Sequence, residues 1–511
     1  MSQLQSLYRH SLALLTDLYQ LTMAYGYWKL GRAERQSVFH LSFRKNPFGG
    51  GFTVACGLHA AIDYLSSLHF DAEDLAYLAT LRGNDRQPLF EPAFLDYLAN
   101  LKFTCDVDAV PEGTVVFPHE PLVRVTGPIL QAQIIETPLL NLINFETLVA
   151  TKAARVKLAT RGDPVIEFGL RRAQGIDGGL AASRAAYVGG CDATSNVLAG
   201  KLYDIPVKGT HAHSWVMSFD SELESFNAYA GAMPNNCVFL VDTYDTLQGV
   251  RHAVEVGRKL RQAGHEMVGV RLDSGDLAYL SIEARKILDT GGFPNARILA
   301  SNDLDEHVAS SLKEQGAKID TWGVGTRLVT AYDQPALGGV YKLSALRGDD
   351  GKWQYKLKLS EQTAKVSNPG VLQVRRYRKG GEFVADAIYD LDIGRPQWGG
   401  GDHGACTIVD PMDPTRRKAI EPFTTYHELL VPVFRNGSQV CTPPALDDVR
   451  RRTAEQLAGF HGGIKRFMHP HQYPVGLEER LFNLKTELIL KARGARRSEP
   501  VTFAEGTEAR T

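Results

Sequence analysis

Between about residues 135 and 330, short apolar runs alternate with longer segments of helical periodicity. Five of the runs predict strands that are buried on both faces, because their apolar residues are continuous rather than alternating. These runs cover residues 164–168, 237–241, 267–271, 296–300 and 319–322. Amphipathic helices are predicted between them, over residues 247–263, 277–288 and 305–315. Strands that alternate with helices in this way indicate parallel βα units.

Polar residues cluster directly after these strands, where the βα loops begin. The carboxyl ends of parallel strands meet at one edge, so these residues are expected to lie together at a single rim. A (β/α) barrel and a doubly wound open sheet would both produce such a rim. We favour the barrel, because about six units occur and no G-x-G-x-x-G follows the first strand.

The flanks differ from this central region. Residues 1–130 mix helices and strands, residues 339–425 are rich in strands and turns, and residues 426–511 are predicted to be mainly helical. We therefore expect four parts: residues 1–130, an α/β barrel over 131–338, a β-rich segment over 339–425 and a helical C-terminal extension over 426–511.

Composition limits the function classes. The 511 residues include 57 Lys and Arg against 58 Asp and Glu, so no overall charge attracts nucleic acid or an anionic membrane. The longest apolar stretch, residues 129–150, carries several polar residues and predicts a buried helix rather than a membrane span. Six cysteines without a C-x-x-C pair are compatible with a reducing cytoplasm, where we expect the protein.

Carboxylates gather at two neighbouring strand ends. Asp273 and Asp276 flank a glycine turn, and Asp242 and Asp245 form a second pair one strand away. Such carboxylates can accept hydrogen bonds from sugar hydroxyls or hold Mg²⁺ through water. The alternative is ordinary turn chemistry, since Asp and Gly favour turns.

Other strand ends offer groups that bind anions. Gly325 and Thr326 lie in a glycine loop whose backbone N–H groups can surround a phosphate. Arg171 presents a planar donor fork that matches a carboxylate or phosphate. Phe168 can stack on a flat ring, although it can also be an ordinary core residue.

His211 and His213 form an H-x-H pair at a strand end. In a barrel hydrolase such a pair binds metal together with further histidines, but the later strand ends offer only Asp and Asn. The remaining interpretations are a structural histidine and a titratable nucleophile or acid–base group.

The motifs together resemble one family. They are TDLYQ (16–20), FRKNP (43–47), EFGLRR (167–172), GTHAHS (209–214), RLDSGD (271–276) and GGVYKL (338–343). In this order they are similar to the nicotinate phosphoribosyltransferases, type II phosphoribosyltransferases. The resemblance runs from about residue 12 to 345 and continues more loosely to the end. It implies an irregular α/β barrel with an open-faced α/β sandwich domain, formed by residues 1–130 and completed by 339–425.

The implied reaction joins nicotinate to 5-phosphoribosyl 1-diphosphate, giving nicotinate mononucleotide and diphosphate, the first step of NAD synthesis from nicotinate. It is coupled to hydrolysis of ATP through a phosphohistidine. The resemblance implies Mg²⁺, held through diphosphate and water rather than by direct ligation. It also implies a homodimer whose active sites lie at the subunit interface.

The resemblance further implies roles for single residues. His213 would be phosphorylated, Asp273 would contact the ribose, and Asp242 would lie near the magnesium-diphosphate end. Phe168 would cover one face of nicotinate, and Tyr19 of the neighbouring subunit, with Asp17 beside it, the other. The remaining substrate contacts would be those to the ring or its carboxylate (Arg171, Arg271), to the 5-phosphate (Ser301, Asn302, Gly325, Thr326) and to another anion (Arg44, Lys45).

Three alternatives remain open. A relative that prefers nicotinamide is the nearest, since an amide also stacks between aromatic rings. A metal-dependent barrel hydrolase would use His211 and His213. A catalytically silent relative would form no product.

Overall fold

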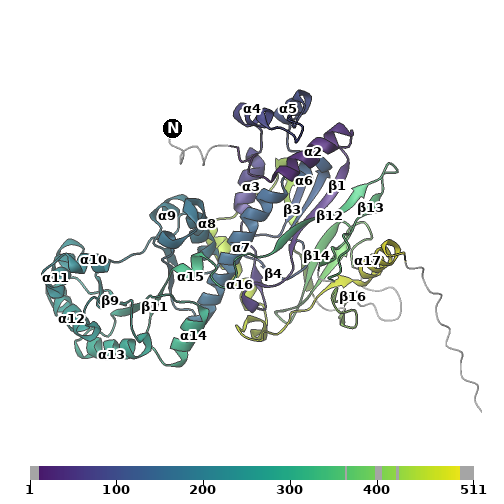
Figure 1. Cartoon of the computed structure of the whole chain (residues 1–511). Helices are drawn as coiled ribbons and strands as arrows, with labels where there is room; N and C mark the ends of the chain where they lie inside the picture. The colour runs from purple at the N-terminus through teal and green to yellow at the C-terminus, as the bar shows by residue number, and fades with distance from the viewer. Residues whose placement is uncertain (1–10, 363–364, 397–405, 422–424, 495–511) are drawn as a thin grey trace, which may run out of the picture.

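The computed structural model describes residues 11–362, 365–396, 406–421 and 425–494. Part of the segment predicted as a C-terminal helical extension, residues 495–511, lies outside this range. Within the described residues, none of the helices has both the length and the apolar character needed to cross a membrane. The chain forms a mixed α/β structure in which one parallel sheet and two mainly antiparallel sheets lie on either side of a long helix (Figure 1).

The central region forms a six-stranded parallel sheet in the order β7-β6-β11-β10-β9-β8. Its strands are β6 (Val165–Glu167), β7 (Ala193–Thr194), β8 (Val238–Leu240), β9 (Gly269–Leu272), β10 (Arg297–Ala300) and β11 (Thr321–Val324). The five predicted strands are confirmed. So are the predicted helices, as α12 (Thr246–Gln262), α13 (Leu277–Thr290) and α14 (Glu306–Glu314).

The order of these strands is nearly cyclic. The first strand, β6, pairs in parallel with the last, β11, and consecutive strands are neighbours except for β7 and β8, which form the two edges of the sheet. A doubly wound sheet instead places its first strand beside strands from the middle of the chain. The strand order therefore argues against the doubly wound alternative.

A seven-stranded sheet gathers segments from three distant parts of the chain, in the order β13-β12-β1-β5-β3-β19-β20. Its strands are β1 (Gln36–Phe43), β3 (Asp106–Ala109), β5 (Val123–Pro128), β12 (Gly339–Arg347), β13 (Trp353–Tyr355), β19 (Val431–Arg435) and β20 (Ser438–Gln439). β1 lies between β5 and β12, so residues after the central region complete a sheet that the N-terminal residues begin.

A second six-stranded sheet has the order β17-β16-β21-β15-β14-β18. Its strands are β14 (Leu372–Lys379), β15 (Glu382–Asp390), β16 (Cys406–Val409), β17 (Arg417–Ile420), β18 (Thr425–Glu428) and β21 (Val475–Glu478). The helical interpretation of residues 426–511 was wrong in part. Helices α16 (Leu446–Ala458) and α17 (Glu479–Ala492) are present, but β19, β20 and β21 lie in the same stretch. These strands are short, and their pairing partners, such as β3 and β15, are far away in sequence.

Helix α7 (Glu136–Ala159) joins the two halves of the molecule (Figure 1). Its first half packs in the core beneath the seven-stranded sheet, through Leu139 and Ile143, and its second half in the core around the parallel sheet, through Val149 and Val156. The other helices at the parallel sheet are α8 (Gly175–Val188), α9 (Val197–Tyr203), α10 (His213–Met217), α11 (Glu222–Ala232), α15 (Thr326–Val329) and the 3-10 helix η2 (Leu170–Arg172).

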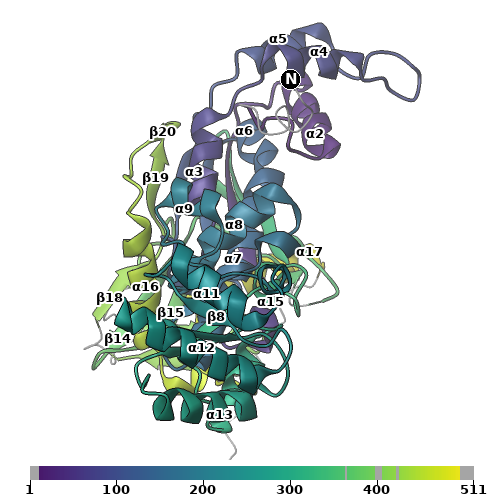
Figure 2. The same cartoon turned by 90° about the vertical axis from the view of Figure 1, so that its left-hand side faces the viewer.

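The remaining elements lie mainly with the seven-stranded sheet and the second six-stranded sheet. They are α2 (Leu18–Lys29), α3 (Leu58–Ser67), α4 (Ala72–Thr80), α5 (Pro92–Ala99), α6 (Ile129–Ile134), the pair β2 (Thr53–Val54) and β4 (Val115–Val116), and the 3-10 helices η1 (Pro47–Gly49) and η4 (Gly462–Lys465). Figure 2 shows α2, α4 and α5 at one end of the molecule and α12 and α13 at the other.

Candidate functional site

A pocket of about 140 Å³ lies at the carboxyl ends of the parallel strands; we call it the strand-end pocket. It brings together eight of the predicted site residues: Phe168, Arg171, Arg271, Asp273, Ser301, Asn302, Gly325 and Thr326. Gly169, Arg172, Asp303 and Gly323 complete its lining. The prediction that these strand ends meet is therefore confirmed.

Phe168 lies at the end of β6, against a strand that leaves room for its ring. A Cβ atom on Gly323 would lie 2.7 Å from Cδ2 of Phe168, so only glycine allows this close approach. On the other side, the Arg271 guanidinium carbon lies 5.5 Å from the Phe168 ring centroid. The ring is half-buried and is held at the pocket by these two neighbours.

Arg271 is fixed by three hydrogen bonds. Its guanidinium donates to Ser301 Oγ at 2.9 Å, to Asp273 Oδ1 at 2.8 Å and to Thr210 Oγ1 at 3.2 Å. Ser301 Oγ also donates to Asp273 Oδ1. The ends of β9 and β10 and the segment that carries Thr210 are thus tied into one network, and the sequence analysis missed the contribution of Thr210. The only available signal was its position directly before the H-x-H pair.

Asp273 is held as a carboxylate. Burial works to raise the pKa of this carboxyl, but the Ser301 hydrogen bond and the Arg271 charge outweigh it, so the pKa lies below the usual value. The group therefore carries a negative charge at neutral pH and accepts hydrogen bonds.

Asp242 and His213 lie beside Asp273. Oδ2 of Asp242 accepts hydrogen bonds of 2.7 Å from the backbone N–H of Asp273 and from the Ser274 hydroxyl. Nε2 of His213 lies 3.9 Å from Asp242 Oδ1 and 3.7 Å from Asp273 Oδ2. Asp242 Oδ1 is buried and has no hydrogen-bond partner in the described residues, so it faces His213 with a free lone pair. The three residues predicted as catalytic are thus adjacent.

The loop after β10 has an unusual backbone conformation, whereas the loop after β11 contains Gly325. Asn302 has φ of 110° and Asp303 of 41°, both in the region that normally favours glycine. Such conformations cost free energy and gather at functional sites, where the surroundings hold them.

Arg172 bridges these two loops, a role that the sequence analysis did not assign. Its Nη1 donates to Thr326 Oγ1 at 3.0 Å and lies 3.7 Å from Asp303 Oδ1. Arg171, by contrast, lines the pocket and has no hydrogen bond or ion pair among the contacts recorded for the described residues.

His211 has a structural role. Its Nε2 accepts a hydrogen bond of 3.3 Å from the backbone N–H of Leu240, and its ring packs against Phe226 and Tyr229. Burial lowers the pKa of His211 to about 4, so the ring is neutral. In the described ranges, the only group of three close metal-ligand side chains is Cys56, Glu112 and Glu146, far from His213 in sequence and already bound to Arg184. The hydrolase alternative therefore lacks a ligand set among the residues that the structure describes.

Tyr19 and Asp17 do not reach the strand-end pocket of their own chain. They lie at the start of α2, where Thr137 Oγ1 donates to Asp17 Oδ2 at 3.0 Å. Figures 1 and 2 both place α2 at the end of the molecule opposite β9 and β11 or the helices beside them. The Tyr19 side chain is largely exposed.

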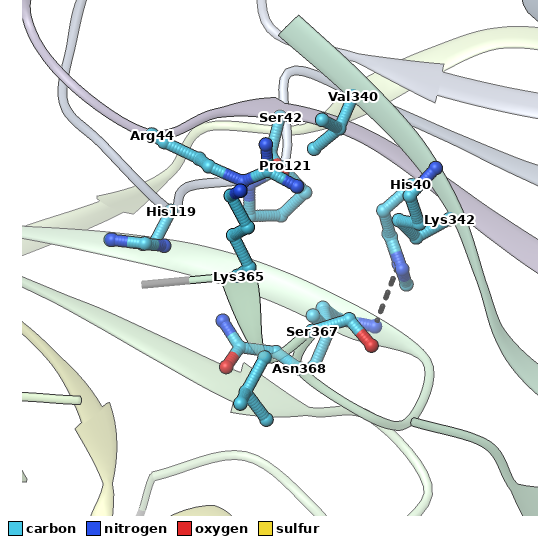
Figure 3. A pocket seen from close by; sticks show the side chains of 12 residues that line it. His40, Ser42, Arg44, His119, Pro121, Val340, Lys342, Lys365, Ser367 and Asn368 are labelled. Carbon is cyan, nitrogen blue, oxygen red and sulfur yellow. Dashed lines mark hydrogen bonds between the residues drawn. The ribbon is translucent and has the colours of Figure 1, made fainter. Parts of the chain in front are cut away.

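Arg44 and Lys45 also lie away from this pocket, after β1. Arg44 lines a second pocket together with Lys342 and Lys365, shown in Figure 3; we call it the cationic pocket. No Asp or Glu is in its lining. Burial lowers the pKa of His40 and of His119, which also line it, so the positive charge comes from the arginine and the lysines. Lys45 lines an adjacent cavity that shares Arg44.

The fold and the site define a mixed α/β protein whose parallel strand ends present cationic, carboxylate and hydroxyl groups around one pocket. Models of the nicotinate phosphoribosyltransferase N-terminal domain, family and C-terminal domain match residues 14–144, 165–355 and 373–485. The chain therefore belongs to the nicotinate phosphoribosyltransferase family.

Individual relatives agree with this assignment. The nicotinate phosphoribosyltransferase of Bacillus subtilis is 41% identical over 94% of this chain and 95% of its own length. That of Dictyostelium discoideum is 39% identical over 93% and 88%. The crystal structure of human nicotinic acid phosphoribosyltransferase superimposes with a TM-score of 0.81 at 33% identity, covering 93% of this chain and 99% of that one.

Proposed function

We propose that the protein is a nicotinate phosphoribosyltransferase, which forms nicotinate mononucleotide and diphosphate from nicotinate and 5-phosphoribosyl 1-diphosphate. The observation that carries this proposal is the strand-end pocket, in which Phe168 and Arg271 meet the carboxylate of Asp273 and two anion-binding loops. Relatives named for this activity match almost the whole chain. The test is a mononucleotide-formation assay with purified protein, in which omission of either substrate must abolish the product.

The reaction needs alignment more than acid–base chemistry. The pyridine nitrogen forms a bond to the anomeric carbon while the bond from that carbon to diphosphate breaks, and the electron pair leaves with the diphosphate. Positive charge develops on the sugar, so the ionised carboxylate of Asp273 stabilises the transition state as it binds the ribose hydroxyls. Phe168 would hold the ring by stacking and Arg171 would pair with its carboxylate.

The loops after β10 and β11 are assigned to the 5-phosphate. Ser301, Asn302, Gly325 and Thr326 supply hydroxyl, amide and backbone donors there. The leaving diphosphate would lie toward Asp242, whose unpartnered Oδ1 has the chemistry of an acceptor for magnesium-bound water. Mg²⁺, when bound with the diphosphate, would stabilise the charge of the leaving group.

His213 is proposed to accept the γ-phosphate of ATP. Its Nδ1 lies 3.1 Å from Thr243 Oγ1, a hydroxyl that can accept the Nδ1 proton in the tautomer that nucleophilic attack by Nε2 requires. Nε2 would attack the γ-phosphorus, and the bond to the bridging oxygen would break with its electrons leaving on ADP. The His213 side chain is 39% exposed, so a nucleotide can approach it. γ-Labelled ATP should leave an acid-labile label that His213→Asn abolishes; equal labelling of this variant contradicts the proposal.

The parallel sheet is proposed to be an irregular, incompletely closed barrel. Residues from all six strands line one interior cavity of about 220 Å³. Between the edge strands β7 and β8, Val207 forms a parallel bridge with Thr194, and His211 accepts the N–H of Leu240. The segment 207–211 therefore lies between β7 and β8, and the His211 side chain, rather than a backbone ladder, makes the hydrogen bond to β8.

A homodimer would complete the site. The strand-end pocket offers one aromatic ring, that of Phe168, while Tyr19 is exposed on α2, at the end of the molecule away from this pocket. Exposed apolar residues gather at both places: Leu18 and Met23 on α2, and Leu170 and Ile176 beside Arg171. Apolar patches of this kind mark interaction surfaces. The cationic pocket would then supply Arg44 to an anionic group of the substrates bound by the other subunit.

Subunit mixing tests this arrangement. Tyr19→Ala and Asp273→Asn should each be nearly inactive alone, whereas unfolding, mixing and refolding them together should restore about a quarter of the wild-type activity, because one site per mixed dimer is intact. Mixing that restores no activity, from subunits shown to co-assemble, refutes the shared site.

Two finer points stay proposals. Preference for nicotinate over nicotinamide depends on Arg171, since only the acid offers a carboxylate to this side chain. Comparing the two substrates, with and without ATP, decides it. Location in the cytoplasm stays a prediction from the sequence.

A further inference from the structure

The two loops that would hold the 5-phosphate are cross-linked by an ion pair between the segments that follow them. Asp305 follows the β10 loop by two residues and caps helix α14, while Arg327 follows Thr326 directly on α15. The Arg327 guanidinium forms an ion pair with Oδ2 of Asp305. Arg327 is not among the residues that line the strand-end pocket, so this contact acts from outside it.

The Asp305 carboxylate makes two kinds of interaction, a helix cap and an ion pair. Its Oδ1 accepts the backbone N–H groups of His307 at 2.9 Å and Val308 at 2.8 Å, which caps α14, and its Oδ2 faces Arg327. The residue is 2% exposed. A carboxylate this buried needs its cation, because an unpaired charge in the interior is costly. The ion pair therefore fixes the start of α14 relative to α15.

The next residue extends the network to α7. Glu306 is fully buried and lies 2.7 Å from both Lys152 Nζ and Arg155 Nε. Lys152 Nζ also lies 2.8 Å from Asp333, beyond α15. Helix α14 and the turn after α15 thus both contact the same buried lysine on the long helix that joins the two halves of the molecule.

The loop after β10 needs such an anchor, because its own backbone conformation is unfavourable. Asn302 and Asp303 have positive φ. Strained segments persist only where surrounding contacts determine them. Hydrogen-bond donors that grip a phosphate must also keep their spacing when the ligand is absent, so that little ordering is needed on binding.

We propose that the Asp305–Arg327 ion pair, anchored through Glu306 and Lys152, sets the spacing of the two loops that bind the 5-phosphate of 5-phosphoribosyl 1-diphosphate. The inference rests on the proposed function, which assigns this phosphate to the same loops. Arg327 and Asp305 are positioning residues in this scheme, since neither lines the pocket.

The test is a double-mutant cycle with Arg327→Gln, Asp305→Asn and the double variant. Asparagine still caps a helix, so Asp305→Asn removes the charge and keeps the acceptor for the cap. Each single variant should raise KM for 5-phosphoribosyl 1-diphosphate about tenfold while kcat and KM for nicotinate change by less than about twofold, because grip on a remote phosphate is lost equally in ground and transition states. The double variant should be no worse than the singles, since both remove one interaction. Arg327→Lys should restore part of the affinity.

Two further variants separate the possible failures. Arg261→Gln removes an arginine ion pair with Glu266, a pair remote from the strand-end pocket, and should leave all constants near wild type. Thr326→Val alters the pocket lining itself and should raise the same KM. If Thr326→Val does so but the cycle variants do not, or if their effects simply add, the positioning role is refuted while the proposed function stands. If Thr326→Val is also silent, the assignment of the phosphate to these loops fails. Thermal unfolding of every variant shows whether a change in KM reflects a damaged fold.

Discussion

Replacement of Asp273 by asparagine tests the centre of the proposed site. The substitution keeps the size of the side chain and removes one negative charge. The carboxylate now accepts hydrogen bonds from the Arg271 guanidinium at 2.8 Å and from the Ser301 hydroxyl, and we propose that it also binds the ribose. Asparagine would leave the guanidinium without its counter-charge and the developing sugar cation without a nearby anion.

The magnitude follows from these contacts. Hydrogen bonds to charged groups contribute about 1.5–3 kcal/mol, against about 0.5–1.5 kcal/mol for neutral ones. Weakening the Arg271 and ribose contacts together should therefore cost about 2–3 kcal/mol of transition-state stabilisation, which is about a 30- to 150-fold loss in kcat/KM. Because the charge matters most as the sugar becomes cationic, most of the loss should fall on kcat.

Steady-state mononucleotide formation at saturating nicotinate and varied 5-phosphoribosyl 1-diphosphate measures this loss. Asp276→Asn is the matched control: it makes the same change in the same loop, but Asp276 caps α13 through Ala278 and Tyr279 and does not line the pocket. We expect the control to keep near wild-type activity, since asparagine also caps helices. A loss below about threefold for Asp273→Asn, or an equal loss for the control, would refute the reasoning.

Three other predictions concern separate parts of the site. Arg171→Ala should raise KM for nicotinate about tenfold or more, because a charged hydrogen bond is lost, and should bring this KM closer to that for nicotinamide. An unchanged ratio of the two KM values would contradict the prediction. Gly323→Ala should lower kcat/KM for nicotinate, because the new Cβ would lie 2.7 Å from the Phe168 ring, and a crystal structure of the variant should show that ring displaced. Burial lowers the pKa of His211 to about 4, below the usual value near 6.5, so the unfolded chain binds an extra proton between these values. The neutral His211 ring therefore contributes fully to the free energy of unfolding above pH 6.5, and this contribution is lost as pH falls toward 4. Urea unfolding at both ends of this pH range should show a smaller decrease in the free energy of unfolding for His211→Leu than for the wild type.

The parallel sheet was predictable because each of its strands has a local signal in the sequence. Each is a continuous apolar run followed by polar residues, and five of them were placed from the sequence with errors of one to two residues at most ends. The outer strands were harder. β19 and β21 are five and four residues long, and they pair with β3, β15 and β16, which lie far away in the sequence, so their own residues carry little signal.

The site divides in a similar way. Phe168, Arg271 and Asp273 lie at the ends of predicted strands, and parallel topology alone requires such ends to meet. Thr210 and Arg172 were not assigned their contacts, because a hydrogen bond to Arg271 or to Thr326 depends on side-chain direction across different loops. The ion pair between Asp305 and Arg327 could not be predicted from the sequence for the same reason.

By itself, the sequence determined the βα alternation, the residue types at the strand ends and the family motifs, since periodicity and short-range order are local properties of the chain. Only the tertiary structure decided that β1 lies between β5 and β12, that His211 serves the fold while His213 faces two carboxylates, and that Tyr19 is remote from its own pocket. These outcomes depend on which distant segments bury each other's apolar surface and satisfy each other's polar groups. That choice is made by the whole chain at once and by no single segment.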